Sequence, residues 1–167
     1  MHYIITPPKC PYGHFGGGVL KLEKYAHLVY NLSMRLTTKQ TQKINEVAKK
    51  YRLKLILLFG SRVDGKIHKE SDFDVAYLPS KKLSYNDEID INFQFTNIFK
   101  HDRVDTVDMR KAPPLLLFGI FRECMILFAE DNLIFPTYRA YAFKKYIEAK
   151  PALEIRFKKL NERIKKL

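Results

Sequence analysis

The sequence has few cysteines and no long apolar run, and each shortage argues against a class of protein. Its only two cysteines, Cys10 and Cys124, lie far apart in unlike surroundings. We therefore expect neither a disulfide framework nor a zinc site, and a reducing cytoplasm is the expected location. No apolar run approaches the roughly 20 residues of a membrane-spanning helix, so we expect no membrane partner. The N-terminus lacks a basic stretch followed by an apolar core, so we also expect no secretory signal.

Acidic residues are too few to balance the basic ones, and the net charge is +12. From Leu133 to Leu167, ten Lys or Arg stand against three Glu, a local charge of +7. Such a surface suits a polyanion, an acidic protein partner or a nucleotide. A solvated helix face explains the charge equally well. Direct nucleic-acid binding through the basic C-terminal helices is therefore an open alternative that we do not favour.

The first fifth of the chain, before Met34, lacks any sustained helical or strand pattern. Prolines and the run Gly16–Gly18 interrupt this part, and "PYGHFGGGVLK" has the spacing of neither a Walker A loop nor a dinucleotide-binding fingerprint. We expect residues 1–33 to be an N-terminal extension. It is either disordered or the result of a mispredicted translation start. Residues 34–131 are the expected folded domain, and 132–167 the expected basic helical segment.

From Met34 onward, helix-like and strand-like patterns alternate. Apolar residues at helical spacing predict helices capped at Thr37 or Thr38, over 85–100, and from Pro113–Pro114 to about Cys124. Short apolar runs predict strands over 53–59, 71–78, 103–109 and 125–129. From about Thr137 the tail predicts two basic helices broken near Pro151. The alternation predicts an α+β fold, a small mixed sheet with helices packed against it.

Two aspartates enter the second predicted strand, in "FGSRVDGKIHKESDFDVAYL" (59–78). Residues i and i+2 of a strand point to the same face, so Asp72 and Asp74 project side by side, and Ala76 and Leu78 continue that face into the core. Two carboxylates this close repel each other unless a cation lies between them. Magnesium binds carboxylate oxygens and keeps positions open for phosphates, so it is the ion that we expect.

Gly60 and Ser61 end the preceding strand, ten residues before Asp72. Gly60 lets a phosphate approach the backbone closely, and free N–H groups together with the Ser61 hydroxyl can hold phosphate oxygens. Either half of this pattern alone is weak. Together, at two strand ends, they predict a site for a metal-bound triphosphate.

The same stretch resembles the minimal nucleotidyltransferases (MNT) of the DNA polymerase beta-type superfamily, and the resemblance runs from about Met34 to Asp131. Gly60-Ser61 and Asp72-Phe73-Asp74 carry it, and Arg62, Gly65 and Ser71 fall where the pattern commonly has Arg, Gly and Ser. The resemblance implies a polymerase beta-type nucleotidyltransferase fold. It also implies that Gly60 and Ser61 hold the β and γ phosphates of a nucleotide. Arg62 would assist them, although an ion pair with Asp64 or Glu70 is an equal alternative.

The family pattern also has a third metal-binding aspartate on a later strand, and "RVDTVDM" (103–109) offers Asp105 and Asp108. These two lie on opposite faces of a strand, so only one can join Asp72 and Asp74. Asp105 matches the family position and is favoured, and Asp108 is expected to cap the turn before Arg110. The resemblance implies two Mg²⁺ ions held by Asp72, Asp74 and Asp105, with Asp105 also serving as general base.

Proteins of this size and type are similar to MntA-type antitoxins, which are paired with HEPN-family RNase toxins. The resemblance implies transfer of AMP from ATP to a tyrosine of such a toxin, with the basic tail as part of the docking surface. Two alternatives stay open: a nucleotidyltransferase that modifies a small molecule such as an antibiotic, and a non-catalytic protein that masks a toxin or nucleic acid. The tail's aromatic residues could form a stacking surface for nucleic acid, but their spacing favours the apolar face of a helix. These are Tyr138, Tyr141, Phe143 and Tyr146.

Overall fold

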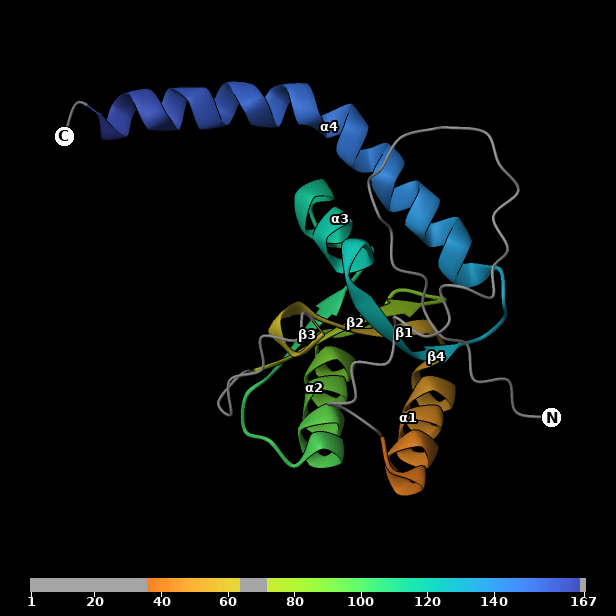
Figure 1. Cartoon of the computed structure of the whole chain (residues 1–167). Helices are drawn as coiled ribbons and strands as arrows, with labels where there is room; N and C mark the ends of the chain where they lie inside the picture. Colours follow the sequence, from red (N-terminus) through yellow and green to blue (C-terminus); the bar gives the residue numbers. More distant parts are fainter. Residues whose placement is uncertain (1–35, 64–71, 166–167) are drawn as a thin grey trace, which may run out of the picture.

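The computed structural model describes residues 36–63 and 72–165 (Figure 1). The predicted N-terminal extension, Gly65 and Ser71 lie outside these residues, as do both alternative ion-pair partners of Arg62. The elements, in chain order, are α1 (Thr38–Tyr51), β1 (Leu53–Phe59), the short 3₁₀ helix η2 (Gly60–Arg62), β2 (Phe73–Pro79), α2 (Tyr85–Phe99), β3 (Val104–Asp108), α3 (Pro114–Arg122), β4 (Cys124–Ala129) and α4 (Ile134–Ile164). The strand predicted from Ser71 begins at Phe73, so Asp72 directly precedes it.

The four strands form one mixed sheet in the order β3-β2-β1-β4. Strand β2 runs parallel to β3, whereas β1 is antiparallel to both β2 and β4. Helices α1 and α2 cover one face of the sheet, and α3 and the first part of α4 cover the other (Figure 1). The predicted α+β class and mixed sheet are confirmed, and β3 lies at an edge of the sheet.

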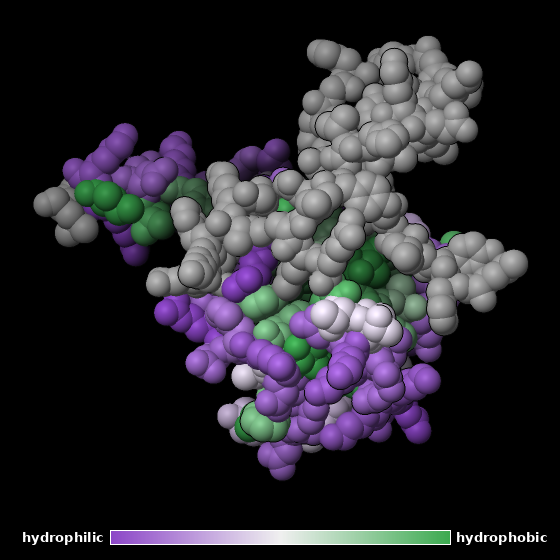
Figure 2. All heavy atoms as spheres, turned by 60° about the horizontal axis from the view of Figure 1, so that its bottom comes forward, coloured by the Kyte–Doolittle hydropathy of each residue, from purple (hydrophilic) through white to green (hydrophobic). Residues whose placement is uncertain are grey.

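Strand β2 separates two hydrophobic cores, one on each face of the sheet. Phe73, Val75 and Tyr77 pack toward α1 and α2, whereas Ala76 and Leu78 pack toward α3 and α4. This alternation is the one that the sequence predicts, and it aims Asp72 and Asp74 to the α3–α4 side. The outer surface of α1 and α2, which faces away from the sheet, is largely hydrophilic (Figure 2).

Helices α1 and α2 both begin at a capping box, and Thr37 is one of the two capping residues predicted for α1. Thr37 accepts a hydrogen bond from the Gln40 backbone N–H at 3.2 Å, and the Gln40 side chain accepts one from the Thr37 N–H at 2.9 Å. Ser84 and Asp87 form the same reciprocal pair at the start of α2. Both are capping boxes, which satisfy N–H groups that the first helical turn leaves without partners.

The tail contradicts the prediction of two helices broken near Pro151, because α4 is a single helix with Pro151 inside it. It also begins at Ile134 rather than near Thr137, since Asp131 Oδ1 accepts hydrogen bonds from the N–H groups of Leu133 and Ile134 at 2.7 and 2.8 Å. Proline removes one helical hydrogen bond and crowds the carbonyl four residues earlier, which can bend a helix without ending it. Figure 1 shows such a bend partway along α4.

The aromatic residues of the tail pack mainly against α3. The rings of Phe143 and Tyr146 lie 5.0 and 4.2 Å from that of Phe118, and Tyr138 lies 6.4 Å from Phe121. These contacts confirm the apolar helix face that the spacing favours, and they anchor the first half of α4 to the domain. Cys124 is a buried free thiol. Among the described residues, no helix combines the length and apolar character needed to cross a membrane.

Pro151→Ala should strengthen α4 beyond its bend. Proline costs about 3 kcal/mol relative to alanine inside a helix, so amide protection between residues 152 and 160 should rise by up to roughly 100-fold. Hydrogen exchange followed by mass spectrometry measures this protection, with exchange in α1 as the internal control. Unchanged protection would mean that the bend has another cause.

Candidate active site

The pairing of β2 with both neighbours brings together the carboxylates predicted from the sequence. Asp74 pairs with Phe59 of β1 and, in parallel register, with Asp105 of β3. Paired residues of adjacent strands project to the same face, so Asp74 and Asp105 point the same way. Asp72 lies two residues before Asp74, and its charge acts on the Asp74 carboxyl. Three carboxylates therefore gather at one end of the sheet, on the α3–α4 side.

The position of Asp74 is electrostatically unfavourable without a cation. Burial raises the pKa of its carboxyl, and the charges of Asp105 and Asp72 raise this pKa further. A carboxyl whose pKa is higher in the folded than in the unfolded state lowers stability as the pH rises through its titration. A bound cation would reverse this effect by favouring the ionised form. The surroundings of Asp74 thus favour the binding of a cation at this end of the sheet.

The donor atoms fit a magnesium ion whose coordination is completed by a phosphate. Asp72 Oδ1 is buried and accepts no hydrogen bond within the described residues, and Arg103 Nη1 lies 3.7 Å from it. No three His, Cys, Asp or Glu side chains of the described ranges converge on a ready-made metal site. Magnesium, however, is usually held by one or two carboxylates together with substrate phosphates and water. These aspartates therefore suit an ion that arrives with a triphosphate.

Gly60 is the residue that allows the chain to turn beside Asp74. Its φ of +78° lies in the left-handed region, and a Cβ built there would lie 2.1 Å from Asp74 Oδ2. Only glycine avoids both the backbone strain and this overlap. Ser61 follows at once and is exposed, so the predicted phosphate-binding pair and the carboxylates lie at the same end of the sheet.

Arg62 contacts the main chain of Asp72 and the aromatic ring next to it. Its guanidinium carbon lies 3.7 Å from the centre of the Phe73 ring, and its Nε donates a hydrogen bond to the Asp72 carbonyl at 3.2 Å. Its Nη2 lies 3.3 Å from His101 Nε2. These contacts hold the main chain that carries Asp72. The role of Arg62 as a phosphate ligand stays a prediction.

Sequence reasoning missed Arg103, the cation beside Asp72. It stands two residues before Asp105, just ahead of β3, and its backbone N–H donates to His101 Nδ1 at 3.2 Å. The alternation of strand residues was the available signal, because residues 103 and 105 share a face. A basic residue on the same face as a predicted metal ligand indicates a charge partner for the site.

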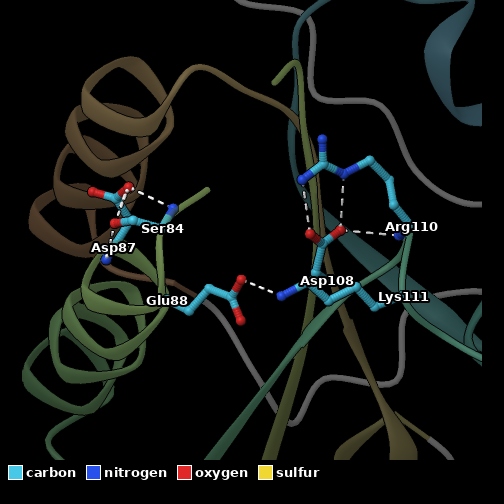
Figure 3. A network of polar contacts seen from close by, with 6 residues as sticks. All are labelled: Ser84, Asp87, Glu88, Asp108, Arg110 and Lys111. Atoms are coloured by element: carbon cyan, nitrogen blue, oxygen red, sulfur yellow. Dashed lines mark hydrogen bonds and ion pairs between the residues drawn. The ribbon is translucent and has the colours of Figure 1, made fainter. Parts of the chain in front are cut away.

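Asp108 lies at the other end of β3, on the opposite face from Asp105. Its carboxylate accepts hydrogen bonds from the Arg110 backbone N–H at 2.9 Å and from the Arg110 guanidinium at 3.2 and 2.9 Å. Figure 3 shows this pairing, with the contacts of Glu88 to Lys111 and of Ser84 to Asp87 nearby. The expected cap before Arg110 is therefore present, and Asp105 is the aspartate of β3 that joins Asp72 and Asp74.

Gly60→Ala should lower the free energy of unfolding by at least about 1–2 kcal/mol, because a left-handed residue with a Cβ is strained and Asp74 must move. Urea unfolding measures the loss. Gly119→Ala is the matched control: a Cβ at Gly119, inside α3, meets no atom within 4 Å, and helix propensity favours alanine there by up to about 1 kcal/mol. Equal effects of the two substitutions would contradict the close approach of Gly60 to Asp74.

Comparison with known structures identifies proteins that share this fold. A chain in the crystal structure of a toxin–antitoxin with AMP-PNP has a TM-score of 0.63 and 22% identity, covering 72% of this chain and 97% of that one. A chain in the complex of tri-AMPylated Shewanella oneidensis HEPN toxin with MNT antitoxin has a TM-score of 0.59 and 19% identity, covering 73% and 96%. A chain of the MntA–HepT toxin–antitoxin has a TM-score of 0.60 and 18% identity, covering 74% and 98%. At these identities the likeness shows a shared fold.

No curated protein matches the sequence. The model of the family described as polymerase beta, nucleotidyltransferase, matches residues 42–133, which contain the whole sheet and all the predicted site residues. The match spans more than half of the chain, and it confirms the fold that the Gly60-Ser61 and Asp72-Phe73-Asp74 pattern implies. The protein belongs to the polymerase beta nucleotidyltransferase family.

Proposed function

We propose that this protein is an antitoxin that transfers AMP from ATP to a tyrosine of a HEPN-family RNase and so silences it. The observation that carries the proposal is the gathering of Asp72, Asp74 and Asp105 beside the Gly60–Ser61 turn, in a member of a nucleotidyltransferase family. This end of the sheet carries both parts that the reaction requires. These are carboxylates for a metal-bound triphosphate and a backbone turn that a phosphate can approach closely.

The triphosphate would lie across the Gly60–Ser61 turn. The glycine leaves the backbone open to the β and γ phosphates, and the exposed Ser61 hydroxyl can donate a hydrogen bond to them. Asp72 and Asp74 would hold Mg²⁺, with Asp105 completing the site for a second ion. When bound, Mg²⁺ supplies neutralisation of the triphosphate and of the departing pyrophosphate. Arg62 keeps Asp72 in place through its main-chain carbonyl.

The acceptor hydroxyl would approach from the side of Asp105. Asp105 is exposed on the edge strand, whereas Asp74 is partly buried, so Asp105 is the carboxylate that a large acceptor can reach. The acceptor oxygen forms a bond to the α phosphorus as the bond from this phosphorus to the bridging oxygen breaks. Asp105 takes the proton of the hydroxyl, and pyrophosphate leaves.

The similar structures support the choice of acceptor. One is described with AMP-PNP, a nucleotide of the ATP type, and another contains a tri-AMPylated HEPN toxin in complex with an MNT antitoxin. This chain shares their fold over most of their length. A HEPN toxin as partner, ATP as nucleotide and AMP as the transferred group therefore form one consistent proposal.

Asp72→Asn/Asp74→Asn should reduce AMP transfer at least about 100-fold, because several kcal/mol of transition-state stabilisation depend on the bound cations. The assay uses α-phosphate-labelled ATP, Mg²⁺ and the product of the neighbouring gene, with mass spectrometry of that product. Asp102→Asn/Glu130→Gln makes the same change in charge at exposed positions and should leave transfer intact.

Two outcomes would contradict the proposal. If the wild-type protein neutralises the partner without any transfer of AMP, masking is the function. If the wild-type protein modifies a small hydroxylated molecule but no protein, the acceptor class is wrong.

Asp105→Asn and Asp108→Asn should have opposite effects. Asp105→Asn should abolish AMP transfer. Because Asp105 is exposed, this variant should keep its free energy of unfolding within about 0.5 kcal/mol of the wild-type value. Asp108→Asn should lower the free energy of unfolding by about 1–3 kcal/mol, because Asp108 is buried and its contacts to Arg110 weaken. At temperatures well below its unfolding transition, this variant should still transfer AMP. Transfer assays and urea unfolding on both variants test this. Loss of transfer only in Asp108→Asn would exchange the two roles.

A further inference from the structure

The part of α4 beyond Pro151 carries large hydrophobic side chains that the described residues leave exposed. Phe157 and Leu160 are each 52% exposed, and Ile164 is 57% exposed. This part of α4 extends away from α3 and the sheet (Figure 1), and its hydrophobic side chains stand among hydrophilic ones (Figure 2). The aromatic contacts that anchor α4 to α3 end at Tyr146. Packing among residues 36–63 and 72–165 therefore does not account for these side chains.

Their spacing places them on one side of the helix. Leu153, Phe157, Leu160 and Ile164 follow one another at intervals of four, three and four residues. At 100° per residue they fall within a stripe about 60° wide. We call these four residues the α4 stripe. Alternating intervals of three and four are the pattern of a coiled-coil seam, which packs against another helix.

The charges beside the α4 stripe indicate the kind of helix that fits it. Arg156 and Arg163 lie along one flank by the same helical rotation, and Lys150 lies along the other, 3.8 Å from Glu154. From residue 150 to residue 165 there are six basic and two acidic side chains. A second copy of this chain, packed antiparallel, would place the flank of Arg156 and Arg163 against itself, which is repulsive. A helix with acidic flanks is complementary.

A membrane surface fits the stripe less well than a helix does. A helix that lies on a membrane buries a broad apolar face, whereas the α4 stripe is narrow. The remaining large apolar side chain of this part, Ile155, points to the opposite side of the helix and does not widen the stripe. Lys158 and Lys159 also lie away from the stripe, where they form a solvated face.

We propose that the α4 stripe is a docking site for an acidic amphipathic helix of a protein partner. In the cell that partner is the protein that accepts AMP, and this assignment rests on the proposed function, whereas docking itself does not. The chemistry occurs at one end of the sheet, and the stripe holds the acceptor protein through a separate surface.

Calorimetric titration of the full chain with two synthetic helical peptides tests the site. Both peptides are roughly 21 residues long, or three heptads, with Leu at the a and d positions; one has Glu at e and g, the other Lys. The acidic peptide should bind at least about tenfold more tightly than the basic one. Phe157→Asp/Leu160→Asp should weaken this binding at least about tenfold. Ile155→Asp, a change at a similarly exposed position on the opposite side, should not.

A charge reversal separates docking from a loss of helix structure. Arg156→Glu/Arg163→Glu keeps the apolar stripe and should reverse the preference, so that the basic peptide binds more tightly. Equal binding of the two peptides to the wild-type protein would overturn the proposal. So would equal losses in Ile155→Asp and Phe157→Asp/Leu160→Asp, binding to anionic phospholipid vesicles in place of the peptides, or stripe-dependent self-association in sedimentation.

The link to the acceptor has its own readout. In AMP transfer to the HEPN protein, Phe157→Asp/Leu160→Asp should raise the KM for that protein at least about tenfold and leave kcat unchanged. An unchanged KM would overturn the assignment of the stripe to the acceptor. A wild-type protein that binds the acidic peptide but transfers no AMP would support the docking site and contradict the proposed function.

Discussion

The site depends on the register of β2, which holds Asp74 between Phe59 on one side and Asp105 on the other. Carboxylates repel each other, and nothing in their own chemistry keeps them together. Hydrophobic residues on both faces of the strand fix their positions, since a shift of one residue would turn Val75 and Tyr77 out of one core and Ala76 out of the other. Burial of apolar side chains thus maintains an arrangement of charges that would otherwise separate.

The position of Asp74 also explains why residue 60 is a glycine. The carboxylate of Asp74 occupies the space that any side chain at position 60 would need, so the turn after β1 has no Cβ and takes a left-handed φ. The open backbone and the carboxylate are therefore one feature of the structure. This explains in physical terms why a glycine at one strand end and an aspartate at the next belong to the same motif.

Much of this could be predicted from the sequence, because the elements are short and their signals are local. The capping box at Thr37, the alternation in β2 and the opposite faces of Asp105 and Asp108 each follow from the spacing of a few residues. Features that depend on distant neighbours could not be predicted. The packing of Arg62 on Phe73 and His101 requires the β2–β3 pairing, and the start of α4 depends on the Asp131 carboxylate. Proline at 151 is a strong local signal, but it predicts a break where the helix only bends.

Because β3 is the edge strand, no further strand of the described sheet stands beyond Asp105. Under the proposed function, a turn and two strands shape the nucleotide side of the site, whereas the described residues leave the acceptor side, at Asp105, exposed. Under the proposed function, an open acceptor side cannot select a hydroxyl by the fit of a pocket. Selection then rests on effective concentration: a surface that tethers the acceptor protein raises the local concentration of its hydroxyl near Asp105 to about the millimolar range typical of short flexible tethers. Such an enzyme distinguishes acceptors by what is bound to it and for how long.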